Sequence, residues 1–228
     1  MTAAGTRARV RAELTREIAE VARRHLASAG AAALSLRAVA RELGMASSAV
    51  YRYFPSRDDL LTALIVDAYD TLGEAAEGAE AAAPREDLRG RWHAACTAAR
   101  EWAVAHPHEY ALVYGSPVPG YAAPEATIAP AARVGLVLCR VIADAIARGE
   151  AAVPEEDEAA AAAAALEPDV AVDLGLPPAV AARAVMAWSS LYGAISFELF
   201  GHTNNVVADH EAFFRGVADH LATLVGLP

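Results

Sequence analysis

The stretch from residue 35 to residue 61, SLRAVARELGMASSAVYRYFPSRDDLL, constrains the fold more than any other part of the sequence. Its first apolar residues are spaced as on one face of a helix, at Leu36, Val39, Ala40 and Leu43. Gly44 follows the last of them and predicts a helix end in the left-handed conformation. Val50 and Phe54, four residues apart, predict the inward face of a second helix. The pattern therefore predicts two short helices joined by a tight turn.

A third helix follows directly. Pro55 ends the second helix because its nitrogen carries no hydrogen. Ser56 and Asp59 have the spacing of a capping box, which opens a long amphipathic helix with Leu60 and Leu64 on its buried face. A short helix-turn-helix held by a long third helix is the geometry that places one exposed helix in the major groove of DNA. The stretch thus predicts a unit that binds double-stranded DNA.

The segment GMASSAVYRYFPSRDDLL resembles the signature of TetR-family transcriptional regulators, and the resemblance covers roughly residues 10–65. It implies contacts to base edges from Arg37, Ser47, Ser48 and Arg52. It implies contacts to DNA phosphates from Tyr51, Tyr53 and Arg57. Two positions depart from the usual pattern: Ala46 stands where a Ser commonly caps the recognition helix, and Ala49 where a Thr commonly contacts phosphate. Ser47 is expected to take over the cap. The alternative is a scaffold that kept this fold and lost DNA binding.

The charge of the chain supports a DNA-binding end once it is divided. The net charge is −10 over 228 residues. Residues 1–60 hold ten arginines against six acidic residues, a net of +4, whereas the remaining residues carry a net of −14. Arginine contacts release counterions from DNA, and nearby acidic residues would oppose that release. The difference in sign therefore suits a protein that touches phosphate at one end only.

The hydrophobic content of 55% is ample for a helical core. The two cysteines, Cys96 and Cys139, form no metal-ligand spacing and are interpreted as packed thiols in a reducing cytosol. The N-terminus lacks the apolar segment of a secretory signal, and no apolar run is expected to reach the ~18 residues of a membrane span. We therefore expect a cytoplasmic protein with no membrane contact, metal or cofactor.

The chain has no convincing strand, so the predicted fold class is all-α. Residues 1–72 are expected to form the three-helix DNA-binding domain, with residues 1–9 disordered in isolation. Residues 73–228 are expected to form a larger helical domain for ligand binding and dimerisation. The acidic, alanine-rich segment 150–176 is interpreted as a peripheral excursion with no assigned role.

The second domain resembles the WHG-type ligand-binding domain of some TetR-family members, through Trp102, His106-Pro107, Tyr110, a Pro-rich loop, and Trp188 with Tyr192-Gly193. A ligand cavity needs apolar and aromatic walls with few polar groups. The residues that offer both a flat face and a hydrogen bond are Trp102, Tyr110, Tyr114, Trp188 and Tyr192. They are the predicted ligand pocket, with ordinary core packing as the alternative for each.

An enzymatic site is the competing interpretation of two histidine-containing pairs. His93 and Cys96 are three residues apart on a helix, and His106 and His108 flank a proline. Either pair would suit a nucleophile or a metal site, but no third group with suitable spacing accompanies them. The chain is therefore predicted not to be an enzyme.

The last helix carries an apolar stripe that is the predicted dimer interface, at Phe214, Val217, Leu221 and Leu224. A two-fold symmetric dimer presents two reading helices, so its operator should be an inverted repeat. The predicted function is a homodimeric repressor released from such an operator by a small apolar or aromatic molecule. The alternative is a helical small-molecule or protein-binding module without operator-specific regulation.

Overall fold

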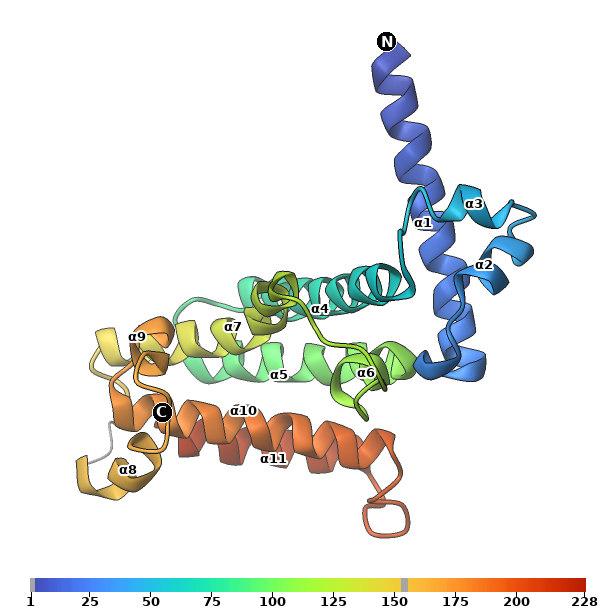
Figure 1. Cartoon of the computed structure of the whole chain (residues 1–228). Coiled ribbons are helices and arrows are strands. Elements are labelled where there is room, and N and C mark those ends of the chain that lie inside the picture. Colours follow the sequence, from blue (N-terminus) through green and yellow to red (C-terminus); the bar gives the residue numbers. More distant parts are fainter. Residues whose placement is uncertain (1–2, 153–155) are drawn as a thin grey trace. The chain divides into compact units, whose positions relative to one another are not determined.

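The computed structural model describes residues 3–152 and 156–228, and every regular element within these ranges is a helix (Figure 1). The predicted all-α class is confirmed. The chain forms two compact units. The helix-turn-helix unit comprises the chain up to Tyr69 together with His106–Ile128, and the bundle unit comprises Asp70–Ala105 and Ala129–Pro228. The assignment of residues 1–72 and 73–228 to separate functions stays a prediction.

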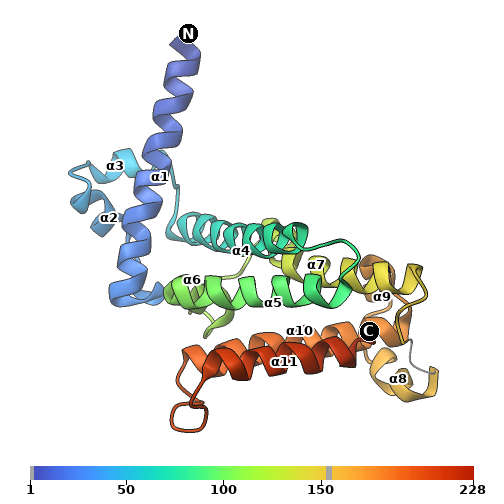
Figure 2. The same ribbon diagram turned by 180° about the vertical axis from the view of Figure 1, so that it is seen from behind.

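The helix-turn-helix unit is built from the first half of the chain plus one later segment. Its elements are α1 (Ala3–Ala29), the 3-10 turn η1 (Ala31–Ala33), α2 (Leu36–Glu42), α3 (Ser47–Val50), the beginning of α4 (Arg57–Ala82), α6 (Pro107–Tyr114) and η2 (Glu125–Thr127). Helix α2 lies against both α1 and α3 (Figure 2). Because α1 begins at Ala3, the expectation of disorder in residues 1–9 is wrong for residues 3–9, which extend the helix.

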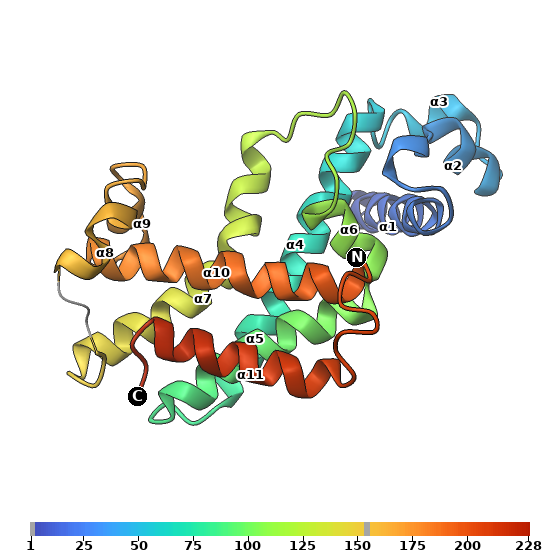
Figure 3. The ribbon, with the colours of Figure 1, turned by 90° about the horizontal axis from the view of Figure 1, so that it is seen from below.

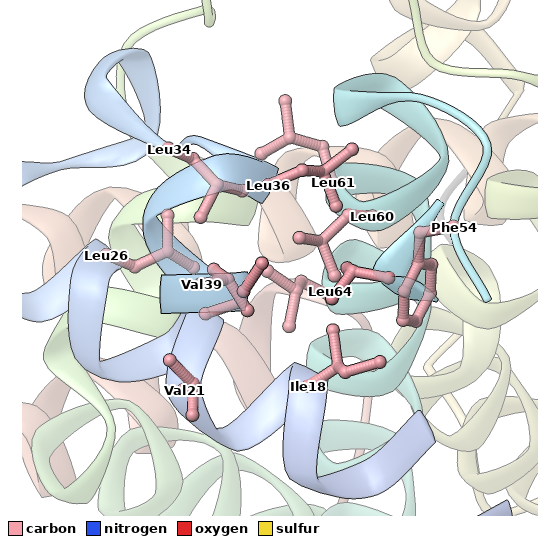
Figure 4. Close-up of a cluster of buried hydrophobic side chains, with 13 residues drawn as sticks. Ile18, Val21, Leu26, Leu34, Leu36, Val39, Phe54, Leu60, Leu61 and Leu64 are labelled. Atoms are coloured by element: carbon pink, nitrogen blue, oxygen red, sulfur yellow. The ribbon is translucent and has the colours of Figure 1, made fainter. Parts of the chain in front are cut away.

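The core of this unit is formed by one apolar face from each helix. Ile18, Val21 and Leu26 of α1 point toward Val39 of α2 and toward Leu60 and Leu64 of α4, with Phe54 at the edge (Figure 4). All seven are buried. Burial of a side chain of this size contributes roughly 1.5–3 kcal/mol, so the predicted periodic faces hold the unit together.

The turns around α3 match the sequence only in part. Gly44 has φ 65°, the left-handed conformation that was predicted for it. The Ser56 hydroxyl accepts a hydrogen bond from the Asp59 N–H at 3.1 Å, so Ser56 caps α4 as predicted. The Asp59 carboxylate accepts from the Ser56 hydroxyl at 2.7 Å, where a complete capping box would use the Ser56 backbone N–H. Ser47, however, is the first helical residue, and Ala46 holds the N-cap position without a side-chain hydrogen bond. The prediction of a Ser47 cap is wrong, and α3 is shorter than expected.

The bundle unit contains the remaining helices. They are the end of α4, α5 (Leu88–Ala105), α7 (Ile128–Ala147), α8 (Glu156–Ala163), α9 (Val170–Leu174), α10 (Pro178–Leu199) and α11 (His210–Leu224). Helices α10 and α11 run side by side, and α8 packs beside α10 (Figure 3). The alanine-rich segment thus contributes two short helices that pack on the bundle. Glu155, which belongs to this segment, lies outside the described residues.

By length and composition alone, Glu125–Ala147 is apolar enough to cross a membrane, contrary to the expectation from sequence. Core helices of soluble proteins pass the same test. In the bundle unit Val137 and Ile142 of α7 are buried, and Arg133 on the same helix pairs with two carboxylates of α4. These contacts are typical of a core helix.

Ion pairs fix the end of α4 within the bundle unit. Arg91 of α5 is 1% exposed, and its Nε donates a hydrogen bond to Glu80 at 2.6 Å. Its Nη1 lies 2.7 Å from Asp144 of α7, although the angle is poor for a hydrogen bond and the contact is therefore ionic. Arg85 bonds the same two carboxylates at 2.8 Å. Helices α4, α5 and α7 thus share one network of charges.

Candidate DNA-binding surface and ligand cavity

The four predicted base-reading residues lie on exposed positions of α2 and the α3 segment. Arg37, Ser47, Ser48 and Arg52 are all exposed, whereas Val39, Ala40 and Val50 on the opposite faces are buried. The side chains of Arg37 and Arg52 make no hydrogen bond or ion pair with any residue that the structure describes. An unpaired guanidinium keeps all five of its N–H donors available for a partner.

The predicted phosphate-contacting residues differ from one another in their surroundings. Tyr51 is exposed. Tyr53 is half-buried, and the guanidinium of Arg11 lies 5.2 Å from the centre of its ring. Arg11 also donates a hydrogen bond to the Arg52 carbonyl at 3.2 Å, so α1 supports the segment that follows α3. Of the three predicted phosphate-contacting residues, Tyr51 is therefore the most exposed, because Tyr53 and Arg57 are half-buried.

Arg57 has an intramolecular role that the sequence did not indicate. Its Nη2 donates a hydrogen bond to the Ala31 carbonyl at 2.9 Å, and its Nε donates one to the Leu34 carbonyl at 3.2 Å. These bonds fasten the beginning of α4 to the turn between α1 and α2. A phosphate contact from Arg57 would have to share a guanidinium that is already bonded.

Sequence reasoning missed Arg41 as a member of this surface. Arg41 follows Arg37 by four residues, the spacing of one helix face, and its side chain is likewise exposed. Within the described part of the chain, the arginines with neither an ion pair nor a side-chain hydrogen bond are Arg16, Arg37, Arg41, Arg52 and Arg140. Three of the five belong to the α2–α3 face, which we define as Arg37, Arg41, Ser47, Ser48 and Arg52.

A cavity of about 230 Å³ lies within the bundle unit. Its walls come from four helices: Trp92 from α5, Gly135 and Cys139 from α7, Leu174 from α9, and Val185 and Trp188 from α10. None of the described residues that line it carries a charge. Trp92 donates its indole N–H to the Ala218 carbonyl at 3.0 Å, so that donor is used. The cavity is therefore apolar, and Trp188 contributes the aromatic face that the sequence predicted.

The other predicted pocket residues lie elsewhere. In the bundle unit, Trp102 donates a hydrogen bond to Thr71 at 3.2 Å, and the Tyr192 ring lies 5.9 Å from the Trp188 ring. In the helix-turn-helix unit, the Tyr110 and Tyr114 rings are 5.1 Å apart. Among the five, Trp188 is the one that lines the apolar cavity. No local pattern in the sequence indicated that α9 would form part of the wall.

The predicted dimer stripe lies mainly on the buried side of α11. Phe214 and Leu221 are 4% and 3% exposed within the single chain, and Val217 and Leu224 are half-buried. Phe214 and Leu221 are therefore core residues of the bundle unit, because their apolar surface is already covered. The exposed apolar side chains of these helices include Met186 and Phe197 on α10 and Phe213 on α11.

The residue pairs that suggested an enzyme have other surroundings. Burial raises the pKa of the Cys96 thiol, which disfavours the nucleophilic thiolate. His93 lies 2.8 Å from the Asp219 carboxylate, which links α5 to α11. No group of three or more potential metal ligands occurs in the part of the chain that the structure describes.

Comparison with known proteins matches both parts of the chain. Residues 18–64 match the model of bacterial regulatory proteins of the tetR family, and residues 92–221 match the tetracyclin repressor-like C-terminal domain. The HTH-type transcriptional regulators Mb1846 of Mycobacterium bovis and Rv1816 of Mycobacterium tuberculosis are each 40% identical to this chain over 200 residues. Those 200 residues cover 86% of this chain and 85% of each relative.

Solved structures show the same fold. The regulatory protein SCO4313 superposes with a TM-score of 0.75 at 33% identity, over 94% of this chain and 98% of that one. The TetR-family regulator PfmR of Thermus thermophilus superposes with a TM-score of 0.59 at 20% identity, over 92% and 98%. These similarities and the helix-turn-helix geometry lead to one conclusion: the chain belongs to the TetR family of bacterial transcriptional regulators.

Proposed function

We propose that the protein is a homodimeric repressor that binds an inverted-repeat operator and is released by a small apolar or aromatic molecule. The observation that best supports DNA binding is the α2–α3 face, where three exposed arginines have no partner among the described residues. Arginine pairs with guanine edges or phosphates through two hydrogen bonds at once. Because the operator is double-stranded DNA, the protein acts in the cytoplasm.

The effector part of the proposal is supported by the apolar cavity of the bundle unit. Ligand sites are concave and mostly apolar, and they are usually formed before the ligand arrives. The cavity has these properties, and Trp188 in its wall makes fluorescence a direct reporter of occupancy. A ligand changes DNA affinity only if it binds the two states of the regulator unequally.

The homodimer is supported by the apolar side chains that α10 and α11 leave exposed. Phe197 and Phe213 are 55% and 52% exposed. Contiguous exposed apolar surface commonly marks a protein interface. Phe213→Glu should convert the dimer to a monomer without unfolding it, as measured by sedimentation. Val104→Glu, at an exposed apolar position of α5, is the matched control and should remain dimeric.

DNA binding is tested by fluorescence anisotropy with DNA from the promoter region of its own gene and with a scrambled duplex. Arg52→Ala should cost about 1–3 kcal/mol on the operator and much less on the scrambled duplex, as expected for a base contact. Arg140→Ala removes an unpaired arginine of the bundle unit and should change neither affinity.

Tyr51→Phe should weaken both duplexes alike, because a phosphate contact carries no sequence information. If wild-type protein bound both duplexes equally, the alternative of a helical binding module without operator-specific regulation would be favoured. If Arg52→Ala kept the wild-type preference for the operator, Arg52 would not read bases.

A further inference from the structure

We infer that the apolar cavity of the bundle unit takes an uncharged, hydrocarbon-rich molecule of about nine non-hydrogen atoms, and that α9 forms its outer wall. The size follows from volume. An engineered apolar cavity of about 150 Å³ holds one benzene molecule, and this cavity measures about 230 Å³. The inference rests on the proposed function, because it names the class of effector that the regulator would sense.

The chemistry of the walls excludes a charged ligand. Among the described lining residues, the polar side-chain groups with no structural hydrogen bond are the indole N–H of Trp188 and the thiol of Cys139. Burial raises the pKa of the Cys139 thiol to about 11. It is therefore a neutral thiol, a weak donor and a weak acceptor. The neighbouring arginine on α7, Arg133, is bonded to Asp70 and Glu77 of α4. A carboxylate in the cavity would lose its hydration and find no charged partner, with at most the neutral indole N–H of Trp188 to donate to it.

Helix α9 gives the segment 150–176 a place in this site. Val170 and Leu174 line the cavity, and the helix ends at Gly175 in the left-handed conformation. Trp188 is 40% exposed, and Leu136 nearly as much, so both lie on the side of the cavity nearest to solvent. The excursion that the sequence left without a role is thus a wall of the ligand site.

Gly135 provides a way to fill the cavity without disturbing its surroundings. A Cβ atom added at Gly135 would meet only the Trp188 ring, at 3.9 Å, which is ordinary van der Waals contact. Gly135→Met should therefore fold and occupy part of the space. Gly78 of α4 has no atom within 4 Å of an added Cβ, so Gly78→Met is the matched control.

The test is calorimetric titration of the full chain with propylbenzene, with hydrocinnamate, which adds a carboxylate to a similar skeleton, and with pyrene, which is much larger. Propylbenzene should bind saturably, and hydrocinnamate should bind at least about 100-fold more weakly because its carboxylate would be buried without a charged partner. Pyrene should not bind. Gly135→Met should weaken propylbenzene at least about tenfold, whereas Gly78→Met should match the wild type.

Three results would overturn this assignment: no propylbenzene binding by the wild type, equal affinity for hydrocinnamate, or unchanged affinity in a folded Gly135→Met. Titration without DNA keeps this test separate from the proposed function. If propylbenzene binds but operator DNA is not released, the ligand class stands and the mechanism of release fails.

A different observation points to Arg133 as the positioning residue that passes occupancy of the cavity to α4. Its Nη1 donates to the Asp70 carbonyl at 3.0 Å and carboxylate at 2.8 Å, and its Nε and Nη2 donate to the Glu77 carboxylate at 3.1 and 2.7 Å. A Cβ atom at Gly73 would lie 2.7 Å from the Arg133 Nε. Arg133 therefore lies directly on the α4 backbone, where only a glycine leaves room.

The same turn of α7 faces both the cavity and α4. Ala132 and Gly135 line the cavity, and Arg133 between them holds α4 through four hydrogen bonds. A displacement of α7 by a ligand must therefore either move α4 or break these bonds. Charge-assisted, two-pronged bonds of this kind are among the strongest side-chain hydrogen bonds.

Hydrogen exchange on α4 residues 70–82 tests the coupling. Propylbenzene should change their exchange rates at least about threefold in the wild type, and the change should vanish in Arg133→Gln and in Gly73→Ala. Arg140→Gln, an unpaired arginine on the same helix, should behave as the wild type. An unchanged rate in the wild type, or an equal change in Arg133→Gln, would overturn the role of Arg133.

Discussion

In the helix-turn-helix unit, Arg37, Arg41 and Arg52 are exposed and have no ion pair among the described residues. In the bundle unit, Arg91 and Arg133 instead bond acidic residues of α4. Arginine costs stability when it is buried without a partner and little when it stays in water. The comparison indicates that the α2–α3 face keeps its arginines available for an external anion, whereas Arg91 and Arg133 hold helices of the bundle unit together.

The largest effect should come from removing a cation that the bundle unit has buried. Arg91→Ala leaves Glu80 with only the exposed Arg85 and opens a void, so it should destabilise the bundle unit by about 3–5 kcal/mol. Urea unfolding followed by tryptophan fluorescence reports this unit, since Trp92, Trp102 and Trp188 all belong to it.

Arg215→Ala is the control for this experiment, because Arg215 forms an exposed pair with Glu211 on α11. Its loss should cost less than about 0.5 kcal/mol. A similarly small loss in Arg91→Ala would break the contrast between the two units.

An intermediate effect is expected from Arg57, an arginine of the helix-turn-helix unit that is bonded internally. Arg57→Ala removes hydrogen bonds to the Ala31 and Leu34 carbonyls and should destabilise the turn by about 1.5–3 kcal/mol. Hydrogen exchange in η1 and α2 should rise accordingly. Arg52→Ala, on the same unit, should leave exchange unchanged. If both variants behaved alike, the distinction between internal and external arginines would not hold within this unit.

The smallest effect concerns how the thermal stability of the bundle unit changes as the pH is lowered. His93, followed by Arg89, lowers the pKa of Asp219 below its ordinary value of 3.8. A carboxyl group with a lowered pKa stabilises the fold at pH values above its ordinary pKa. That contribution is lost as the pH falls through the lowered pKa. Asp219→Asn should therefore unfold at a lower temperature than the wild type near neutral pH, and the difference should shrink below about pH 3.

Thermal melts between about pH 7 and pH 2.5 measure this difference. Asp173→Asn, at an exposed position of α9, is the control and should track the wild type throughout. A difference for Asp219→Asn that stayed constant down to the lowest pH would show that its charge is not the source.

Local patterns were the part of the fold that the sequence predicted well. The left-handed Gly44 and the Ser56 cap depend on residues within a few positions of each other, so spacing alone indicates them. The α11 stripe was harder, because a periodic apolar face predicts burial without naming the surface that covers it. Phe214 and Leu221 are covered by residues of the same chain.

The candidate sites depended more on distant parts of the chain. Arg57 meets carbonyls more than twenty residues away, and no local pattern records that contact. The cavity joins Trp92 to α9 and α10, so its outline depends on helix packing. Trp188 was found from sequence because a large aromatic residue stands out, whereas Gly135, which creates space, does not.

The α2–α3 face contains no lysine, and neither does the rest of the chain. Its charge therefore resides wholly in guanidinium groups, which stay protonated at any pH that the fold survives. Enzymes and reagents that acylate lysine amines have no target on this face. Lysine acetylation therefore cannot change the affinity of this face for DNA. A dicarbonyl reagent that condenses with exposed guanidinium groups should instead abolish operator binding, and bound operator should protect the three arginines of the face.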